Sequence, residues 1–197
     1  MNRIHLLIVL LAAIAVPFAA ADTIQLNQNN LGISGSIGTV TLTQGSGGVM
    51  VTFTANSGYS LKTNGGDFLF DTNVALTAGS ISNLKVDGFS PNFGFTTGAT
   101  RAGVTYSYDI TNLMKGTVPK GYVSANTVSF FVSGVTLQQL ETGNFGVHFC
   151  VGGGTKCGPS TGFAHGHSSA VPEPGTLSLL GTGILGLAGV MRRRFAA

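Results

Sequence analysis

The chain has 197 residues, with ten lysines and arginines, seven aspartates and glutamates, and a formal net charge of +3. The positive excess comes from the two ends, because Arg3 and the triplet Arg192–Arg194 supply four of the ten basic residues. All seven acids lie between Asp22 and Pro174, so this part carries six basic and seven acidic residues, a net charge of −1. Without surplus cations to neutralise phosphates, the sequence argues against nucleic-acid binding.

Residues 1–21 have the three parts of a secretory signal peptide. Arg3 and His5 form a short basic region, Leu6–Val16 is apolar, and Ala19-Ala20-Ala21 fits the small-residue pattern of a cleavage site, with Asp22 as the new N-terminus. The alternative is an uncleaved anchor, but this apolar run is too short to span a hydrocarbon core of about 30 Å. We therefore expect export through the Sec machinery.

Residues 22–170 are the size of one domain, poor in charge and rich in glycine, threonine, serine and asparagine. Apolar and polar side chains alternate in many short segments, which is the period of a half-buried strand. Only Thr136–Glu141 indicates a helical turn, so parallel βαβ units have no room. The predicted strands are Ile37–Gln44, Val49–Ala55, Asp67–Asp71, Ile81–Val86, Val104–Ile110, Asn126–Val132 and Phe145–Val151.

The predicted fold class is therefore all-β, an antiparallel two-sheet sandwich of jelly-roll-like type, flanked by a signal-peptide helix and a C-terminal transmembrane helix. The glycine-rich break at Gly45–Gly48 predicts a hairpin between the first two strands, with threonines on one face. Asn27–Ser36 and Thr161–Ala170 lack a clear alternation and are expected to be loose.

Cys150 and Cys157 are the two cysteines of the chain. In an oxidising compartment we expect them to pair, and closing so small a loop stabilises a fold by roughly 2–3 kcal/mol in the chain-entropy model. Two free thiols are the alternative. A redox-active pair is disfavoured because the C-x-x-C spacing is absent.

No catalytic constellation stands out in the sequence. His165 and His167 point the same way in an extended segment and, with His148, suggest a metal site, but the local acid is Glu173 alone and no free cysteine is expected. Asp67 and Asp71 lie about 13 Å apart along a strand, farther than glycoside hydrolysis uses. Neither a serine nucleophile elbow nor a phosphate loop has the required spacing. We expect no enzyme, no metal and no cofactor.

The chain has no tryptophan, which removes the commonest ring for stacking on sugars. A carbohydrate-binding role would then depend on tyrosines. The four candidates are Tyr59, Tyr106, Tyr108 and Tyr122.

Residues 171–197 form a three-part tail. In Val171-Pro172-Glu173-Pro174 the two prolines fix φ and remove amide donors, which predicts an extended, exposed joint. Thr176–Met191 carries no charge, and a helix over it would span roughly 24 Å, which Gly175 and snorkelling arginine stems make sufficient for a membrane.

The third part of the tail is a basic stop. It consists of Arg192, Arg193 and Arg194. A short flank rich in arginine stays on the cytoplasmic side of a membrane. Everything before the tetrad is therefore predicted to lie outside.

This tail resembles the PEP-CTERM sorting signal of Gram-negative bacteria, with tetrad, apolar span and arginine stop in the same order. The resemblance implies recognition and cleavage near Val171–Pro174 by an exosortase-like membrane protease. It also implies transient anchoring in the inner membrane and delivery to the cell surface or the extracellular space, in the company of polysaccharide and biofilm. A plain C-terminal anchor that follows a Pro-Glu-Pro hinge is the alternative.

A second, weaker resemblance concerns the domain itself. The order of Gly38–Thr43, Asp67–Phe70 and Gly162-Phe163 looks like that of a recurring β domain of PEP-CTERM proteins. This resemblance implies a fold class and no activity. Three functions are open for residues 22–170: a structural or interaction protein, a carbohydrate-binding module, and a secreted hydrolase. The targeting signals and the dearth of catalytic groups favour the first.

Overall fold

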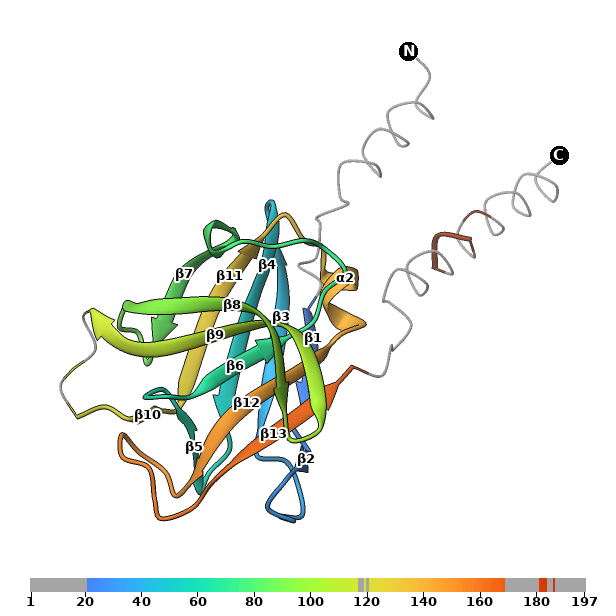
Figure 1. Cartoon of the computed structure of the whole chain (residues 1–197). Coiled ribbons are helices and arrows are strands. Elements are labelled where there is room, and N and C mark those ends of the chain that lie inside the picture. Colours follow the sequence, from blue (N-terminus) through green and yellow to red (C-terminus); the bar gives the residue numbers. More distant parts are fainter. Residues whose placement is uncertain (1–20, 117–118, 120, 169–180, 184–185, 187–197) are drawn as a thin grey trace, which may run out of the picture.

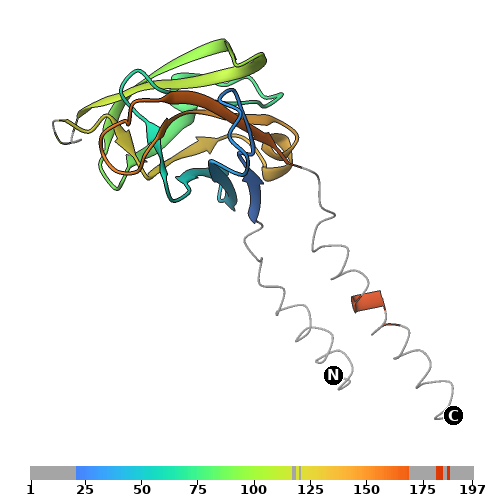
Figure 2. The same ribbon diagram turned by 90° about the horizontal axis from the view of Figure 1, so that it is seen from below.

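The computed structural model describes residues 21–116, 119, 121–168, 181–183 and 186. Most of them form two antiparallel β-sheets that pack face to face (Figure 1, and from below in Figure 2). The predicted antiparallel β architecture is confirmed.

Both targeting segments fall largely outside the described residues. They include the expected signal-peptide helix, most of the expected membrane span Thr176–Met191, and the whole arginine stop of Arg192, Arg193 and Arg194. Among the residues that are described, no helix has the length and apolar character needed to cross a membrane. The membrane span and its stop therefore stay predictions from the sequence.

A five-stranded sheet forms one layer, in the order β1-β3-β4-β11-β7. The predicted hairpin joins β3 to β4, and Gly47 in its turn has a φ of 77°, a left-handed conformation that glycine adopts without steric cost. The chain leaves this sheet after β4, returns to it for β7, and returns again for β11. Its strands are β1 (Ala21–Gln25), β3 (Gly38–Gly45), β4 (Gly48–Ala55), β7 (Ile81–Val86) and β11 (Thr127–Ser133).

An eight-stranded sheet forms the other layer and is centred on β12. One side of β12 pairs with β13, while the other side pairs with β6 at its beginning and with β5 at its end. The sheet continues through β9 and β8 beyond β6, and through β10 beyond β5. Its strands are β2 (Gln28–Asn29), β5 (Tyr59–Lys62), β6 (Asp67–Phe70), β8 (Pro91–Arg101), β9 (Val104–Gly116), β10 (Ser124–Ala125), β12 (Asn144–Val151) and β13 (Thr161–His167).

The expectation that Thr161–Ala170 is loose was wrong for β13, which pairs with β12 along its whole length. The inward positions of β13 are small because neighbouring segments lie close, including the Gln25 carbonyl beside Gly166. A Cβ on Gly166 would meet Ile24 of β1 at 3.1 Å, and one on Gly162 would meet the Leu31 side chain at 2.7 Å. Glycine therefore stands where an apolar residue would have produced the alternation of a strand.

Within residues 21–168 the described chain also forms two short helices: η1 (Ala78–Ser80) and α2 (Leu137–Glu141). The predicted helical turn at Thr136–Glu141 corresponds to α2 and is confirmed. Thr136 caps this helix, because its amide donates to Gln139 Oε1 at 2.8 Å while its hydroxyl accepts from the Gln139 amide at 3.4 Å.

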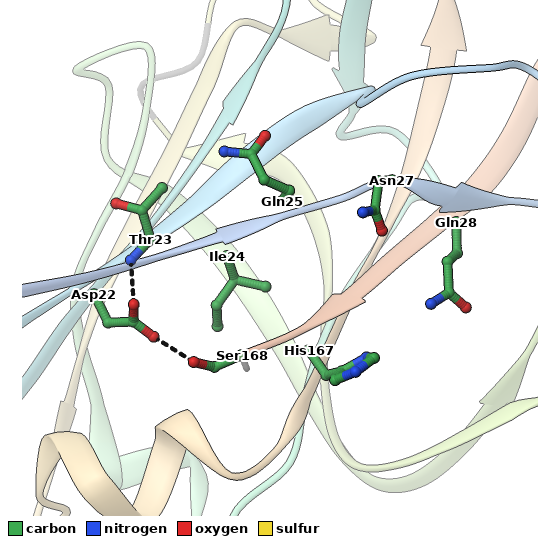
Figure 3. Close-up of a pocket in the computed structure, with 8 residues that line it drawn as sticks. All are labelled: Asp22, Thr23, Ile24, Gln25, Asn27, Gln28, His167 and Ser168. Carbon is green, nitrogen blue, oxygen red and sulfur yellow. Dashed lines mark hydrogen bonds between the residues drawn. The ribbon is translucent and has the colours of Figure 1, made fainter. Parts of the chain in front are cut away.

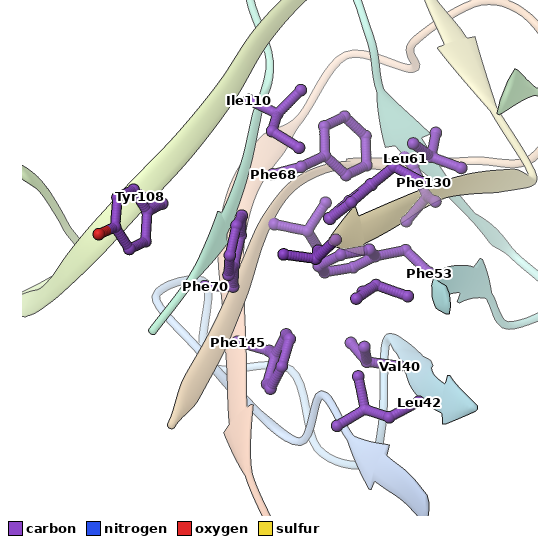
Figure 4. Packing of buried hydrophobic residues seen from close by; sticks show 14 of the residues in the cluster. Val40, Leu42, Phe53, Leu61, Phe68, Phe70, Tyr108, Ile110, Phe130 and Phe145 are labelled. Atoms are coloured by element: carbon purple, nitrogen blue, oxygen red, sulfur yellow. The ribbon is translucent and has the colours of Figure 1, made fainter. Parts of the chain in front are cut away.

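Phenylalanine rings fill the space between the two sheets (Figure 4). Phe53 of β4 lies at the centre, with its ring centroid 5.4 Å from that of Phe68, 6.2 Å from Phe130 and 6.3 Å from Phe145. All four side chains are fully buried. Because these rings come from β4, β6, β11 and β12, one cluster ties both sheets together.

Replacing Phe53 with alanine should lower the free energy of unfolding by about 3–5 kcal/mol, because it removes a buried ring and leaves a cavity. Denaturant unfolding of the full chain, followed by circular dichroism, measures this loss. Leu31→Ala is the matched control, since Leu31 is 40% exposed and should change stability by less than about 0.5 kcal/mol. Equal midpoints for the two variants would show that Phe53 is not central to the core.

Candidate functional site

The two ends of the folded domain lie together. β1 begins it and β13 ends it, and the Ser168 hydroxyl donates to Asp22 Oδ2 at 2.7 Å. The second carboxylate oxygen of Asp22 accepts from the Thr23 amide at 2.8 Å. The segments that enter and leave the domain are therefore attached at one place, between the two sheets (Figure 1).

A cavity of about 290 Å³ lies at this junction (Figure 3). Its walls come from β1, from the segment that leads to β2, and from the end of β13. They carry amide, hydroxyl and imidazole groups beside one buried isoleucine. The lining residues are Asp22, Thr23, Ile24, Gln25, Asn27, Gln28, His167 and Ser168.

The predicted cleavage site falls at the edge of this region. Ala21 is the first residue of β1 and pairs with Thr43, and Asp22 pairs with Leu42, whereas Ala19 lies outside the described residues. Cleavage after Ala21 would leave Asp22 as the first residue of β1, still placed to bind Ser168. The cleavage position itself stays a prediction.

The three histidines suggested as metal ligands do not converge. His148 stacks on Phe163, with ring centroids 4.3 Å apart, and His165 Nε2 lies 2.9 Å from Gln28 Oε1. Burial is the largest cause of a lowered pKa at both His148 and His165, and His167 contributes further at His165. Within the described ranges, no group of three or more His, Cys, Asp or Glu residues is arranged to hold a metal ion.

Cys150 and Cys157 form a disulfide, with their Cα atoms 5.1 Å apart. The glycine-rich loop that they close is held at two further points. Ser60 donates to the Gly152 carbonyl at 2.9 Å, and Ser124 donates to the Gly154 carbonyl at 2.9 Å. This stretch is a cross-linked turn between β12 and β13.

The hairpin of β8 and β9 bends over the outer face of the eight-stranded sheet, and its tip lies across β12 and β13 (Figures 1 and 2). Ala102 and Gly103 turn the chain at the tip, with φ of 49° and 81°. Ala99 and Tyr106 pack there against Leu69 of β6 and form a second, smaller apolar cluster. The hairpin thus covers a set of side chains that a flat sheet would leave in water.

Two carboxylates and one guanidinium lie in this covered region. Arg101 Nε donates to Asp67 Oδ2 at 2.8 Å, and Arg101 Nη2 lies 3.8 Å from Asp109 Oδ2. Asp67 and Asp109 are only 8% and 2% exposed. The Arg101 guanidinium also lies 5.9 Å from the centroid of the Phe163 ring, a cation–π contact.

Burial raises the pKa of Asp109 to about 7, and the nearby negative charge of Asp67 adds to the rise, while the positive charge of Arg101 opposes it. In the described part of the chain, Asp109 Oδ1 has no hydrogen-bond partner. Arg101 is therefore within ion-pair distance of both carboxylates, and its contact with Asp67 is the shorter one.

The acid pair differs from the one that the sequence suggested. Asp71 does not act with Asp67, because its carboxylate accepts from the amide and hydroxyl of Ser107 and from the amide and side chain of Asn144. The partner of Asp67 is Asp109, which β9 brings beside it through strand pairing. No local signal in the sequence marks this pair.

The tyrosines proposed as a sugar-stacking platform are largely withdrawn from the surface. Tyr106 is 2% exposed and Tyr108 is 8% exposed. Tyr59 and Tyr122 pack against the main core. Alternation predicted that Tyr106 faces the main core. Tyr106 lies instead in the smaller apolar cluster, over Gly146, where a side chain would collide with its ring.

The described domain and its joined ends define a class of protein: an all-β domain whose last strand is followed by a short C-terminal segment. A family model for the PEP-CTERM protein-sorting motif matches residues 170–194. The chain is therefore a PEP-CTERM sorting domain-containing protein, and the motif suggests an exported protein sorted by an exosortase. Searches of curated proteins and of solved structures gave no match.

The residues assigned to sorting all fall within this match. Val171, Pro172, Glu173 and Pro174 form its beginning, and Arg192, Arg193 and Arg194 form its end. These seven residues lie outside the part of the chain that the structure describes. Their roles as cleavage motif and membrane stop therefore stay predictions.

Asp109→Asn removes the titration of this carboxyl while keeping its shape. Asp109 holds its proton up to pH of about 7 in the folded chain but only to about 4 when unfolded. The unfolding free energy of the wild type therefore falls as pH rises through this window. We expect the variant to gain stability relative to the wild type between pH 5 and pH 8.

Thermal denaturation of both proteins across this range provides the measurement. The quantity to follow is the difference in stability between the variant and the wild type. His148 and His165 have lowered pKa values and change stability in the opposite direction below their ordinary pKa. Both proteins contain these histidines, so the difference removes their contribution. A difference that stays constant with pH would contradict the raised pKa of Asp109.

Proposed function

We propose that this protein is exported through the Sec route and held briefly in the inner membrane by residues 176–191, with the arginine stop at 192–194 on the cytoplasmic side. An exosortase-like protease then cuts near Val171–Pro174 and delivers the β domain to the cell surface or the extracellular matrix. The observation that carries this proposal is the sorting-motif match at residues 170–194. The tetrad, the apolar run and the arginines lie within the match.

The joined ends of the domain support this itinerary. Val171 follows Ser168 by three residues, so the tetrad is within about 10 Å of the domain even when that link is fully extended. The end of the domain with Asp22 and Ser168 would then face the membrane until cleavage. The disulfide fits an oxidising compartment outside the inner membrane.

On arrival, a structural or interaction role in a polysaccharide or biofilm setting is the function we favour. A carbohydrate-binding module is the second candidate. The repeated crossing of the chain between the two sheets is compatible with both. A secreted hydrolase is disfavoured because Asp67 and Asp109 are both buried, out of reach of a large substrate. We therefore infer a non-catalytic protein without a cofactor.

Replacing Pro172, Glu173 and Pro174 together with alanine should trap the full-length chain in the membrane fraction of its host, because the protease would lose the groups it recognises. Immunoblots of membrane and extracellular fractions measure this. Glu141→Ala, which changes the other glutamate of the chain, should be processed like the wild type. Normal processing of the triple variant would reject sorting at the tetrad.

A further inference from the structure

Threonine and serine are the commonest residues on the outer face of the five-stranded sheet. Alternate residues of β1, β3, β4 and β11 point into the core, among them Val40, Leu42, Val51 and Phe53. The residues between them point away from the core, because successive side chains of a strand lie on opposite faces. Nothing in the sorting itinerary requires this surface to be uniform.

Strand pairing places these hydroxyl groups in rows. In one row Thr23 of β1 is opposite Thr41, which is opposite Thr52, which is opposite Ser129 of β11. Neighbouring members of a row are about 4.8 Å apart, and successive rows are separated by about 6.8 Å along the strands. The next row contains Gln25, Thr39, Thr54 and Thr127.

Four threonine hydroxyls on this face have no hydrogen-bond partner among the described residues. Within the part of the chain that the structure describes, the side chains of Thr39, Thr41, Thr52 and Thr54 make no hydrogen bond. Each is half-buried by its neighbours, so the rows form a continuous surface. A hydroxyl both donates and accepts, so this surface offers both functions at regular intervals.

The same face carries little charge. No outward residue of β1, β3, β4 or β11 is acidic or basic, and Lys85 on β7 stands at its rim opposite Ser129. At one end Met50 is opposite Phe131. The Phe131 ring lies close over Gly45 and Gly48, where a Cβ would be 3.2 Å and 2.8 Å from it. The two glycines thus leave room for an aromatic surface beside the hydroxyl rows.

We propose that this threonine face binds an extended, uncharged polysaccharide. Rows of hydroxyls match a ligand that repeats hydroxyl groups along its length, and the Phe131 ring offers a surface for the C–H face of a sugar. Anionic polymers are disfavoured, because β1, β3, β4 and β11 place no cation on this face, Lys85 at its rim is bound to Ser90, and residues 22–174 carry a net charge of −1. The inference rests on the proposed delivery of the domain outside the cell, where such polymers occur.

The test is co-sedimentation of the full chain, purified in mild detergent, with insoluble cellulose, chitin and β-1,3-glucan, and with calcium alginate as the anionic comparison. We expect binding to at least one neutral polymer that persists in 1 M salt, since screening weakens only charged contacts. The double variant Thr41→Val, Thr52→Val should lose about tenfold in affinity, the scale of two lost hydrogen bonds. Valine preserves the shape and suits a strand.

Two further variants separate loss of the site from loss of the fold. Thr41→Ser, Thr52→Ser keeps the hydroxyls and should bind, whereas Thr96→Val, Thr97→Val makes the same change at exposed positions of β8 and should also bind. Undiminished binding by the Thr41 and Thr52 valine variant would overturn the proposal, as would preference for alginate. Binding to none of the neutral polymers, or self-association that the valine pair abolishes, would overturn it as well. Each outcome leaves tail processing, and hence the proposed sorting, to be judged separately.

Discussion

The packing of phenylalanine rings between the sheets is the constraint on which the rest of this domain depends. Phe53, Phe68, Phe130 and Phe145 meet from four strands of both sheets, and this contact fixes which face of every strand is inward. The opposite faces are then free to differ. The outer face of the five-stranded sheet carries mainly hydroxyl groups. The outer face of the eight-stranded sheet is partly covered by the β8–β9 hairpin.

The covered face holds two buried carboxylates that share one arginine. Asp67 and Asp109 are both removed from water, and among the described residues Arg101 is the one basic side chain in ion-pair contact with them. A buried carboxylate without full compensation is destabilising, so the proton that Asp109 retains near neutral pH lowers this cost. Apolar contacts of Ala99, Tyr106 and Leu69 beside it help to hold the hairpin down.

Sequence patterns predicted the parts of this protein that are local. Most strands with apolar alternation were found close to their true bounds, as for Val49–Ala55 within β4, but the strand predicted at Val104–Ile110 continues to Gly116 as β9. The sorting tail was recognisable because its three parts are contiguous. β13 was missed because close neighbours require glycine at two of its inward positions, Gly162 and Gly166. The Asp67–Asp109 pair and the position of Tyr106 depend on strand register and on the bend of a hairpin, which no short stretch of sequence encodes.

The shared location of the two chain ends has a mechanical consequence. With the domain anchored by its tail as we propose, a pull from a polymer bound at the proposed site would reach the membrane through Ser168 and the end of β13. β13 is paired with β12 from Thr161 to His167, so tension along this strand shears all of its ladder hydrogen bonds at once and does not peel them apart singly. A domain tethered in the proposed way would resist a pull along β13 through the whole ladder at once.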